Sequence, residues 1–313
     1  MATRREKGLR HHQQIKHKTS YEQSKDLAEL ASRSQLSTAL SADHPIVALN
    51  LQQVRATAEA EAARLRAARA ALAPGLAAAR DGDLEALKAL AAEGWDVRTS
   101  DRHGSTALHW AAGGGHLPIV RWLVEDCGLD PTATVQPKDG RNALHWACRN
   151  GMLPTCRWLV EECGMDPSAP TKDGTSPFHW AVWKGHREVC AWLIEAGADW
   201  RAKNSFGCNA VQWAALSGSV EMCRWLQQVG LELGLLNDNG HSALHKCAIY
   251  GHGDVIAWLL TDTGCNAAEY MGPDDRGSSP SALAAANGYA QLAAELRDVE
   301  DRTLRLPAVY HGN

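Results

Sequence analysis

The sequence predicts an all-α solenoid of stacked helix-turn-helix units with projecting hairpin-like loops, preceded by a helical and disordered N-terminal arm. Two observations predict it. A hexapeptide of the type Thr-Ala-Leu-His-Trp-Ala recurs along the chain, and a glycine follows each copy at a fixed offset. All twelve Trp lie between Trp95 and Trp258, although the chain has only five Tyr and two Phe. This skew indicates one unit copied several times, whereas 313 residues would ordinarily suggest about two globular domains.

The copies stay in register over most of the chain. The hexapeptides begin, the last one most weakly, at Thr106, Asn142, Ser176, Asn209, Ser242 and Ser279. The glycines that follow, with one more at the start of the series, are Gly82, Gly115, Gly151, Gly185, Gly218, Gly251 and Gly288. A period close to 33 residues is long enough for one pair of short helices and a turn.

A period of about 33 residues with a Thr-Pro-Leu-His-x-Ala signature resembles the ankyrin repeat, and the resemblance covers residues 74–299. It implies antiparallel helix pairs stacked into a curved solenoid, with loops projecting at right angles to the helices. The first and last units depart from the pattern and are expected to act as end caps. The repeats are expected near residues 74–99, 100–135, 136–169, 170–202, 203–235, 236–272 and 273–299.

The segments outside the repeats differ in charge. Residues 1–46 are expected to be a basic, disordered tail, residues 47–73 an Ala/Arg-rich helix, and residues 300–313 a C-terminal tail. Residues 1–80 carry a net charge of +6, and the rest of the chain carries −10. Such a tail serves nuclear import, organelle targeting or contact with nucleic acid, anionic lipid or acidic protein, or is only solvated. The helix either packs on the first repeat, extends freely or forms a coiled-coil dimer.

Within a unit, the turn comes before the first helix. Residues 101–104 supply turn chemistry, because a glycine tolerates a positive φ. Thr106 is placed to cap the first helix, and Gly115 is placed to end it. Corresponding turns are expected to be marked by Asp101, Asp139 and Asp173.

The second helix carries a buried stripe built around a Trp-Leu pair. Ile119, Val120, Trp122 and Leu123 recur at helical spacing, and later units place a Cys two residues before the Trp. Nine Cys without a CxxC pair or a zinc-type spacing are expected to be small apolar residues in a reducing compartment. One extra residue before each of Gly128, Gly164 and Gly264 is expected to lengthen the second helix or its exit loop.

Recurring histidines raise the question of catalysis or metal binding. One set follows a cap residue by three positions, the spacing of neighbours across a helical turn, so a local hydrogen bond explains it: His109, His145, His179 and His245. The same interpretation holds for His116, His186 and His252. No nucleophile elbow and no phosphate-binding glycine loop is present in the sequence. The sequence therefore predicts no enzyme, no cofactor and no metal site.

Partner-binding residues are sought where the units differ. The two residues before each closing glycine are expected at the exposed end of the first helix, where three successive units present Trp183, Leu216, Ile249 and Tyr250. These side chains either form an interface or only pack on their neighbours. The Trp position of the hexapeptide becomes Lys246 in one unit and is expected to be half exposed. Further candidates are Arg149 and Lys184 beside that site, and Arg141, Lys172, Phe206 and His241 along the loop edge.

The predicted function is a non-enzymatic protein-protein interaction scaffold or adaptor that binds a protein partner on its concave face and loop fingers. The alternative is a nuclear regulatory factor whose basic residues 1–20 contact nucleic acid. No apolar run approaches the ~18 residues that would span a bilayer. The chain is expected to be an intracellular monomer, cytoplasmic or nuclear, and the sequence does not identify its partner.

Overall fold

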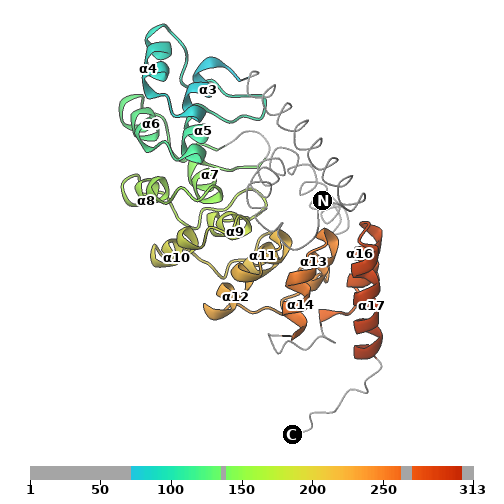
Figure 1. Ribbon diagram of the computed structural model, residues 1–313. Helices are drawn as coiled ribbons and strands as arrows, with labels where there is room; N and C mark the ends of the chain where they lie inside the picture. Colours follow the sequence, from blue (N-terminus) through green and yellow to red (C-terminus); the bar gives the residue numbers. More distant parts are fainter. Residues whose placement is uncertain (1–71, 135–138, 262–269, 305–313) are drawn as a thin grey trace, which may run out of the picture. The chain divides into compact units, whose positions relative to one another are not determined.

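The computed structural model of the chain describes residues 72–134, 139–261 and 270–304, and every regular element in these ranges is a helix (Figure 1). The chain divides into two compact units, Met1–Ala77 and Ala78–Asn313, and almost all of the described residues belong to the second. Within the described ranges, seven helix pairs follow one another along the sequence. The predicted all-α stack of helix pairs is confirmed.

The helices form two rows in Figure 1, and from α5 on each first helix packs on the first helix of the next unit. The first-helix row comprises α5 (Ala107–Gly114), α7 (Ala143–Arg149), α9 (Pro177–Trp183), α11 (Ala210–Ser217), α13 (Ala243–Tyr250) and α16 (Pro280–Ala286), after α3 (Pro74–Asp81). The second-helix row comprises α4 (Leu84–Ala92), α6 (Leu117–Arg121), α8 (Leu153–Glu161), α10 (Arg187–Glu195), α12 (Val220–Gln228), α14 (Gly253–Thr261) and α17 (Ala290–Leu304). Small, fully buried alanines such as Ala111, Ala147 and Ala181 allow the close approach between first helices.

Each turn is organised by the side chain three residues before its glycine. The Oδ1 atoms of Asp101, Asn204 and Asn237 each accept hydrogen bonds from the backbone N–H groups two and four residues later. Asp101, Asp139 and Asp173 lie in corresponding turns, as predicted, but Asp139 and Asp173 do not occupy the position of Asp101 within the turn. The latter two stand directly before their glycines, so the glycine that adopts a positive φ, and not the acidic residue, sets the register.

From the turn at Asp139 on, backbone hydrogen bonds join each turn to the next. The N–H groups of Lys172, Ser205, Asp238 and Asp275 donate to the carbonyls of Asp139, Asp173, Phe206 and Asn239, over 2.9 to 3.1 Å. This contact requires a close backbone approach. A Cβ atom on Gly207, where φ is 74°, would lie 2.9 Å from the backbone nitrogen of Asp238. The turns therefore form a continuous hydrogen-bonded edge beside the first-helix row.

The recurring histidines of the first helices complete their N-terminal caps. In α7, the Oδ1 atom of Asn142 accepts the backbone N–H of His145, and the Nδ1 atom of His145 accepts the backbone N–H of Asn142 over 3.3 Å. Ser176 with His179 and Ser242 with His245 make the same exchange. The structural role predicted for these histidines is confirmed, because the Nδ1 atom of each ring is bonded at the start of a helix.

The second set of histidines ties each unit to the one before it. The Nε2 atoms of His116, His186 and His252 lie 2.9 to 3.0 Å from the backbone carbonyls of Arg80, Arg149 and Leu216, respectively. A carbonyl only accepts, so Nε2 carries the proton in each ring. The carbonyls belong to the last turns of first helices, where the helix itself leaves them without partners. These histidines are C-terminal caps supplied by the following unit, so their role is structural as predicted, but the bond crosses between units and is not local.

The one-residue insertions widen the second helices locally. The backbone N–H of Cys127 donates to the carbonyl of Trp122, five residues earlier, within a π-helical segment (η1, Trp122–Asp126). Cys163 makes the equivalent bond to Trp158 over 3.2 Å. A π-type turn accommodates one additional residue without changing the packing of the rest of the helix. The third predicted insertion, before Gly264, lies outside the described residues.

The cysteines behave as apolar core residues. Cys148, Cys156, Cys190 and Cys223 are fully buried, and none of the described cysteines forms a disulfide. Burial raises the pKa of Cys223 to about 12, because a thiolate would lose its solvation there. The Cys223 thiol is therefore protonated and unreactive at neutral pH.

The last unit closes the stack with a buried carboxylate. Glu300 of α17 accepts hydrogen bonds from the Ser281 backbone N–H at 2.8 Å, the Ser281 hydroxyl at 2.6 Å and the Ser279 hydroxyl at 3.0 Å. These groups lie at the N-terminus of α16, where a negative charge is favourable. Helix α17 continues to Leu304, past the predicted start of the C-terminal tail at residue 300, and Glu300 is buried in it.

Replacing this carboxylate is expected to destabilise the last unit. Glu300→Gln keeps the shape of the side chain but removes its charge and one acceptor oxygen, so we expect a loss of about 1–3 kcal/mol in the free energy of unfolding. Urea unfolding followed by circular dichroism measures it. Glu295→Gln, an exposed position on the same helix, is the control and should cost less than about 0.5 kcal/mol. Equal effects of the two substitutions would contradict the capping role of Glu300.

Candidate partner-binding surface

Four tryptophans at one position of successive first helices form a column of rings. The ring centroids of Trp110 and Trp146 are 5.4 Å apart, and those of Trp180 and Trp213 are 5.9 Å apart. Arg141 lies between the two pairs, with its guanidinium carbon 5.5 Å from the Trp146 ring and 5.1 Å from the Trp180 ring. The column therefore runs through α5, α7, α9 and α11 with a cation in its middle.

Arg141 is held in this place by the turn that carries it. Its Nε atom donates to the Asp139 Oδ2 atom over 2.7 Å, and both side chains are largely buried. A paired guanidinium still presents its flat face to aromatic rings, so the ion pair and the two stacking contacts are compatible. The sequence places Arg141 on the loop edge, and the structure joins that edge to the tryptophan column.

Trp183 extends the column at the end of α9. Its ring centroid lies 5.5 Å from that of Trp180 and 6.1 Å from that of Trp213. Two cations flank it, with Lys184 Nζ 4.4 Å and the Arg149 guanidinium carbon 5.9 Å from the ring. We call Arg149, Trp180, Trp183, Lys184 and Trp213 the Trp183 cluster. Three successive units contribute to it, so it exists only when they are stacked.

The members of the Trp183 cluster differ in exposure. Trp180, Trp213 and Arg149 are 1%, 6% and 8% exposed, whereas Trp183 and Lys184 are half-buried. The buried members support the two half-buried side chains and limit their rotamers. The accessible side chains of the cluster are therefore Trp183 and Lys184, which are already held in place by their neighbours.

Three other predicted residues are interior. Leu216, Ile249 and Lys246 are 8%, 5% and 6% exposed, so the first two pack on their neighbours. The expectation of a half-exposed Trp position holds for Trp110 and Trp146. It is wrong for Lys246, and for Trp180 and Trp213 as well.

The remaining predicted residues make separate contacts. The Tyr250 ring stacks on His252, with centroids 6.3 Å apart, and burial raises the pKa of its phenol. Phe206 is half-buried and Lys172 is exposed, and both lie in turns whose backbones bond to neighbouring turns. Of the ten predicted partner-binding residues, the structure brings together Arg141, Arg149, Trp183 and Lys184 around the tryptophan rings and places the others elsewhere.

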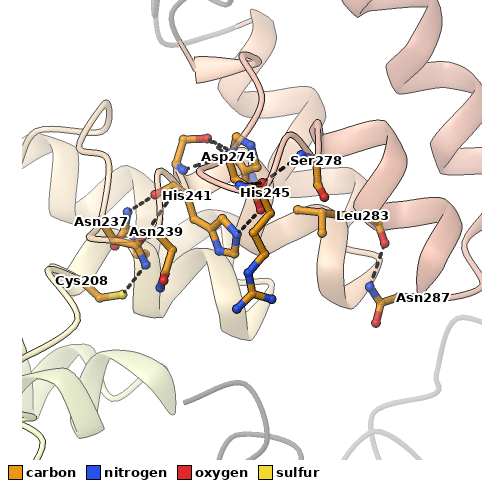
Figure 2. Close-up of polar contacts among 12 residues, drawn as sticks. Cys208, Asn237, Asn239, His241, His245, Asp274, Ser278, Leu283 and Asn287 are labelled. Atoms are coloured by element: carbon orange, nitrogen blue, oxygen red, sulfur yellow. Dashed lines mark hydrogen bonds and ion pairs between the residues drawn. The ribbon is translucent and has the colours of Figure 1, made fainter. Parts of the chain in front are cut away.

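A histidine-carboxylate pair joins the turns of two neighbouring units (Figure 2). The Nε2 atom of His241 lies 2.8 Å from the Asp274 Oδ2 atom, and the His241 ring stacks on that of His245 with centroids 5.3 Å apart. Burial, helped by the charge of Lys246, lowers the pKa of His241 to about 3. Burial alone would raise the pKa of Asp274, but the Ser278 backbone N–H and His241 outweigh it and lower that pKa. A neutral imidazole therefore donates to a carboxylate, which is a structural bond between turns.

The first-helix histidines are unsuited to acid-base chemistry. Burial lowers the pKa of His109, His145, His179 and His245 to about 4, partly opposed by backbone carbonyls of the following turn. Each of these four residues is at most 1% exposed. Within the described residues, no three His, Cys, Asp or Glu side chains are grouped as metal ligands. The recurring histidines of the units thus serve to hold the fold together.

Two features were not recognised in the sequence. Trp180 and Trp213 belong to the Trp183 cluster, which the three-residue spacing from Trp180 to Trp183 along one helix face could have indicated. On the second-helix row, an arginine of one unit lies over the tryptophan of the next unit, with its guanidinium carbon 5.8 to 5.9 Å from the ring centroid. The pairs are Arg121 with Trp158, Arg157 with Trp192 and Arg187 with Trp225. These pairs are about 35 residues apart, so only the stacking reveals them.

Comparisons with known proteins agree with this architecture. Family models of ankyrin repeats match residues 76–124, 133–204, 178–269 and 211–303. The crystal structure of the human ASB11 ankyrin repeat domain superposes with a TM-score of 0.54 at 26% sequence identity, and the match covers 72% of this chain and 98% of that one.

Two curated relatives match shorter segments. The Notch-regulated ankyrin repeat-containing protein of Homo sapiens is 50% identical over 44 residues, which are 14% of this chain and 39% of that protein. The mitochondrial liver isoform of glutaminase from Mus musculus is 41% identical over 56 residues, which are 18% of this chain and 9% of that enzyme. The chain thus spans less than half the length of either relative, and the glutaminase match is confined to repeats. Among the helices described, none is long and apolar enough to cross a membrane.

Proposed function

Because this chain belongs to the ankyrin-repeat family of generally non-catalytic protein-interaction scaffolds, we propose that it is an adaptor that binds a partner protein through the Trp183 cluster and the turns beside it. The cluster lies on the first-helix row, which is continuous from α5 to α16. The observation that carries the proposal is a half-buried tryptophan fixed by two other tryptophans and two cations.

The chemistry of the cluster favours protein binding. Tryptophan and arginine are the side chains most enriched among residues that dominate interface energies, because they combine large contact area with polar groups. The rings around Trp183 already restrict its motion, so a partner loses little conformational entropy in binding it. Lys184 adds a charge that selects the partner's chemistry.

Substitution of the two reachable residues is expected to abolish partner capture. A Trp183→Ser, Lys184→Ser double variant of the full chain should retain its helical content but lose the proteins that the parent chain captures from cell extract. Affinity capture with quantitative mass spectrometry measures this loss, and circular dichroism checks the fold. A broader change that includes Leu216 and Ile249 would test the wrong property, because both are buried and their loss would unfold the stack.

The chain offers a matched control for this experiment. Trp200 and Arg201 are also a tryptophan followed by a cation, with the guanidinium carbon 3.6 Å from the ring, but they lie in a turn outside the Trp183 cluster. A Trp200→Ser, Arg201→Ser variant should capture the same proteins as the parent chain. Unchanged capture by the Trp183 variant, or equal loss by both variants, would refute the proposed surface.

The basic residues 1–20 and all but the last two residues of the predicted helix 47–73 lie outside the described residues, so contact with nucleic acid stays a prediction. Neutralisation of phosphates would give an affinity that falls steeply with salt. Absence of binding to duplex DNA and to RNA at low salt, measured with the full chain, would dismiss it. The expected intracellular location, cytoplasmic or nuclear, likewise stays a prediction.

A further inference from the structure

Two buried thiols lie in contact inside one unit. The sulfur atoms of Cys148 in α7 and Cys156 in α8 are 3.5 Å apart, and one thiol donates a hydrogen bond to the other. Both residues are fully buried, and α7 packs on α8 as the first and second helices of the same unit. A disulfide requires a sulfur separation of about 2.05 Å, so the two atoms have to approach by only about 1.5 Å to bond.

This pairing of cysteines is peculiar to one unit. The position of Cys148 holds alanine or valine in the neighbouring units, namely Ala112, Val182, Ala215 and Ala248. The position of Cys156 holds Val120, Cys190, Cys223 and Ile256. Among the helix pairs that the structure describes, only α7 and α8 therefore carry a cysteine on both sides of the contact. Alanine and valine fill these places in other units, so packing alone does not require two thiols.

We propose that Cys148 and Cys156 are an oxidisable dithiol, which a peroxide converts into a disulfide that joins α7 to α8. One sulfur, as the thiolate, attacks an oxygen of hydrogen peroxide, and the O–O bond breaks. The leaving hydroxide takes up the proton of that first thiol, so the products are a sulfenic acid and water. The second sulfur then attacks the sulfenic sulfur, the S–O bond breaks, and the hydroxide leaves as water with the proton of the second thiol. Two thiols are oxidised, and one peroxide molecule is reduced to two water molecules.

The surroundings of the pair make this reaction slow. Burial, and next the hydrogen bond with Cys156, raise the pKa of Cys148, so the attacking thiolate is scarce while the unit is closed. The oxidant therefore reaches the pair when α7 and α8 open locally. The half-buried Cys127 and Cys163 do not need such an opening. We therefore expect the pair to respond to sustained oxidation and to stay reduced during a short exposure.

The disulfide stabilises the unit that it crosses. A bond between residues eight positions apart closes a loop of the unfolded chain and so removes conformations from it. Cys148 directly precedes Arg149, whose carbonyl lies 3.0 Å from the His186 Nε2 atom of the next unit. The crosslink therefore lies at a junction between two units. This inference goes beyond the proposed function and does not depend on it.

Peptide mapping of the full, folded chain tests the proposal. The chain is incubated with hydrogen peroxide in the absence of denaturant for increasing times, and the remaining thiols are then alkylated in urea. Trypsin cuts after Arg141, Arg149 and Arg157, among other sites, and so places the two cysteines in separate peptides, residues 142–149 and 150–157. We expect mass spectrometry to find these two peptides joined after long incubation and separate again after reduction with dithiothreitol.

Thermal unfolding measures what the bond does to the stack. Oxidation should raise the midpoint of thermal unfolding of the parent chain by about 3–8 °C, and dithiothreitol should reverse the rise. Cys148→Ala introduces the residue of neighbouring units, so it should fold but lose both the joined peptides and the rise. The matched control Cys190→Val removes another fully buried cysteine and introduces the residue found at Val120. It should keep both.

Four results would overturn the proposal. The first is that no joined peptides form during long incubation of the folded chain, and the second is that they form only after urea is added. The third is that Cys148 joins Cys190, which lies close enough to raise its pKa, in place of Cys156. The fourth is an equal rise of the midpoint in Cys148→Ala. None of these results bears on the Trp183 cluster, because partner capture is measured with the reduced chain.

Discussion

Lowering the pH from 7 to 5 is expected to unfold the stack, because its units are capped by buried neutral histidines. Burial lowers the pKa of His109, His145, His179 and His245 to about 4, against 6.5 for an exposed histidine. Between these values the unfolded chain binds more protons than the folded chain. The stability that these groups contribute is therefore fully present above pH 6.5 and is lost as the pH falls toward 4.

The expected loss is comparable to the whole stability of an ordinary domain. At pH 5 an exposed histidine is almost fully protonated and one with a pKa near 4 is not, so each buried histidine costs about 2 kcal/mol relative to pH 7. Four such groups together cost about 8 kcal/mol, against a typical unfolding free energy of about 5–15 kcal/mol. The histidines are distributed over four units, so acid weakens most of the stack at once.

The chain itself supplies the substitution that tests this. Gln212 occupies the histidine position in α11, where its Nε2 atom donates to the carbonyls of Leu235 and His241. His145→Gln should therefore fold at pH 7 and lose about 2 kcal/mol less than the parent chain between pH 7 and pH 5. Urea unfolding at the two pH values measures the difference.

The exposed His103, in a turn, serves as the control for the titration. His103→Gln should leave the pH dependence of unfolding as it is in the parent chain. If His145→Gln and His103→Gln follow the same pH profile as the parent, the buried histidines do not cause the acid sensitivity. If the parent chain is as stable at pH 5 as at pH 7, their pKa values are not lowered.

The local chemistry of a unit was predictable because it is repeated. His145 follows Asn142 by three positions, and His179 follows Ser176 by three positions in the next unit. The same spacing along a helix produces the same capping exchange. A recurring pattern thus predicted both the helix start and the role of the histidine. Asp101 and Asp139 mark corresponding turns from different positions, since the turns accept Asp, Asn or Thr at the organising position.

The candidate site was harder to predict, because exposure depends on how units stack. Trp183 and Leu216 stand at equivalent places before a glycine, yet the first is half-buried and the second is 8% exposed. The difference in exposure depends on which side chains of the neighbouring units cover each position. Arg141 was placed on the loop edge from its position beside a glycine, and only the fold shows it between two tryptophan rings. Sequence identified the candidates, and stacking decided among them.

Phe178→Ala is expected to cost about 3–5 kcal/mol of unfolding free energy, the largest effect of a single substitution considered for this chain. Phe178 is 1% exposed in α9, and its ring centroid lies 6.5 Å from that of Trp225 in α12, so it packs between two units. Urea unfolding of the full chain measures the loss. Phe178→Leu is the matched substitution, because equivalent positions of other units carry Leu108, Leu144 and Leu244; it should cost about 1–2 kcal/mol.

The position of Phe178 within the stack makes its loss more consequential than an equal loss at the end. Units of a repeat protein are stabilised by their neighbours, so a cavity in the fourth pair weakens contacts to both sides. Leu296, 1% exposed in α17, has neighbours on one side only, and Leu296→Ala should melt the last pair while the central units stay folded. Hydrogen exchange distinguishes the two, because Phe178→Ala should lower protection in α9 and α11 together. Equal cost of Phe178→Ala and Phe178→Leu would mean that the ring fills no closely packed space, and the interlocking of units would have to depend on other contacts.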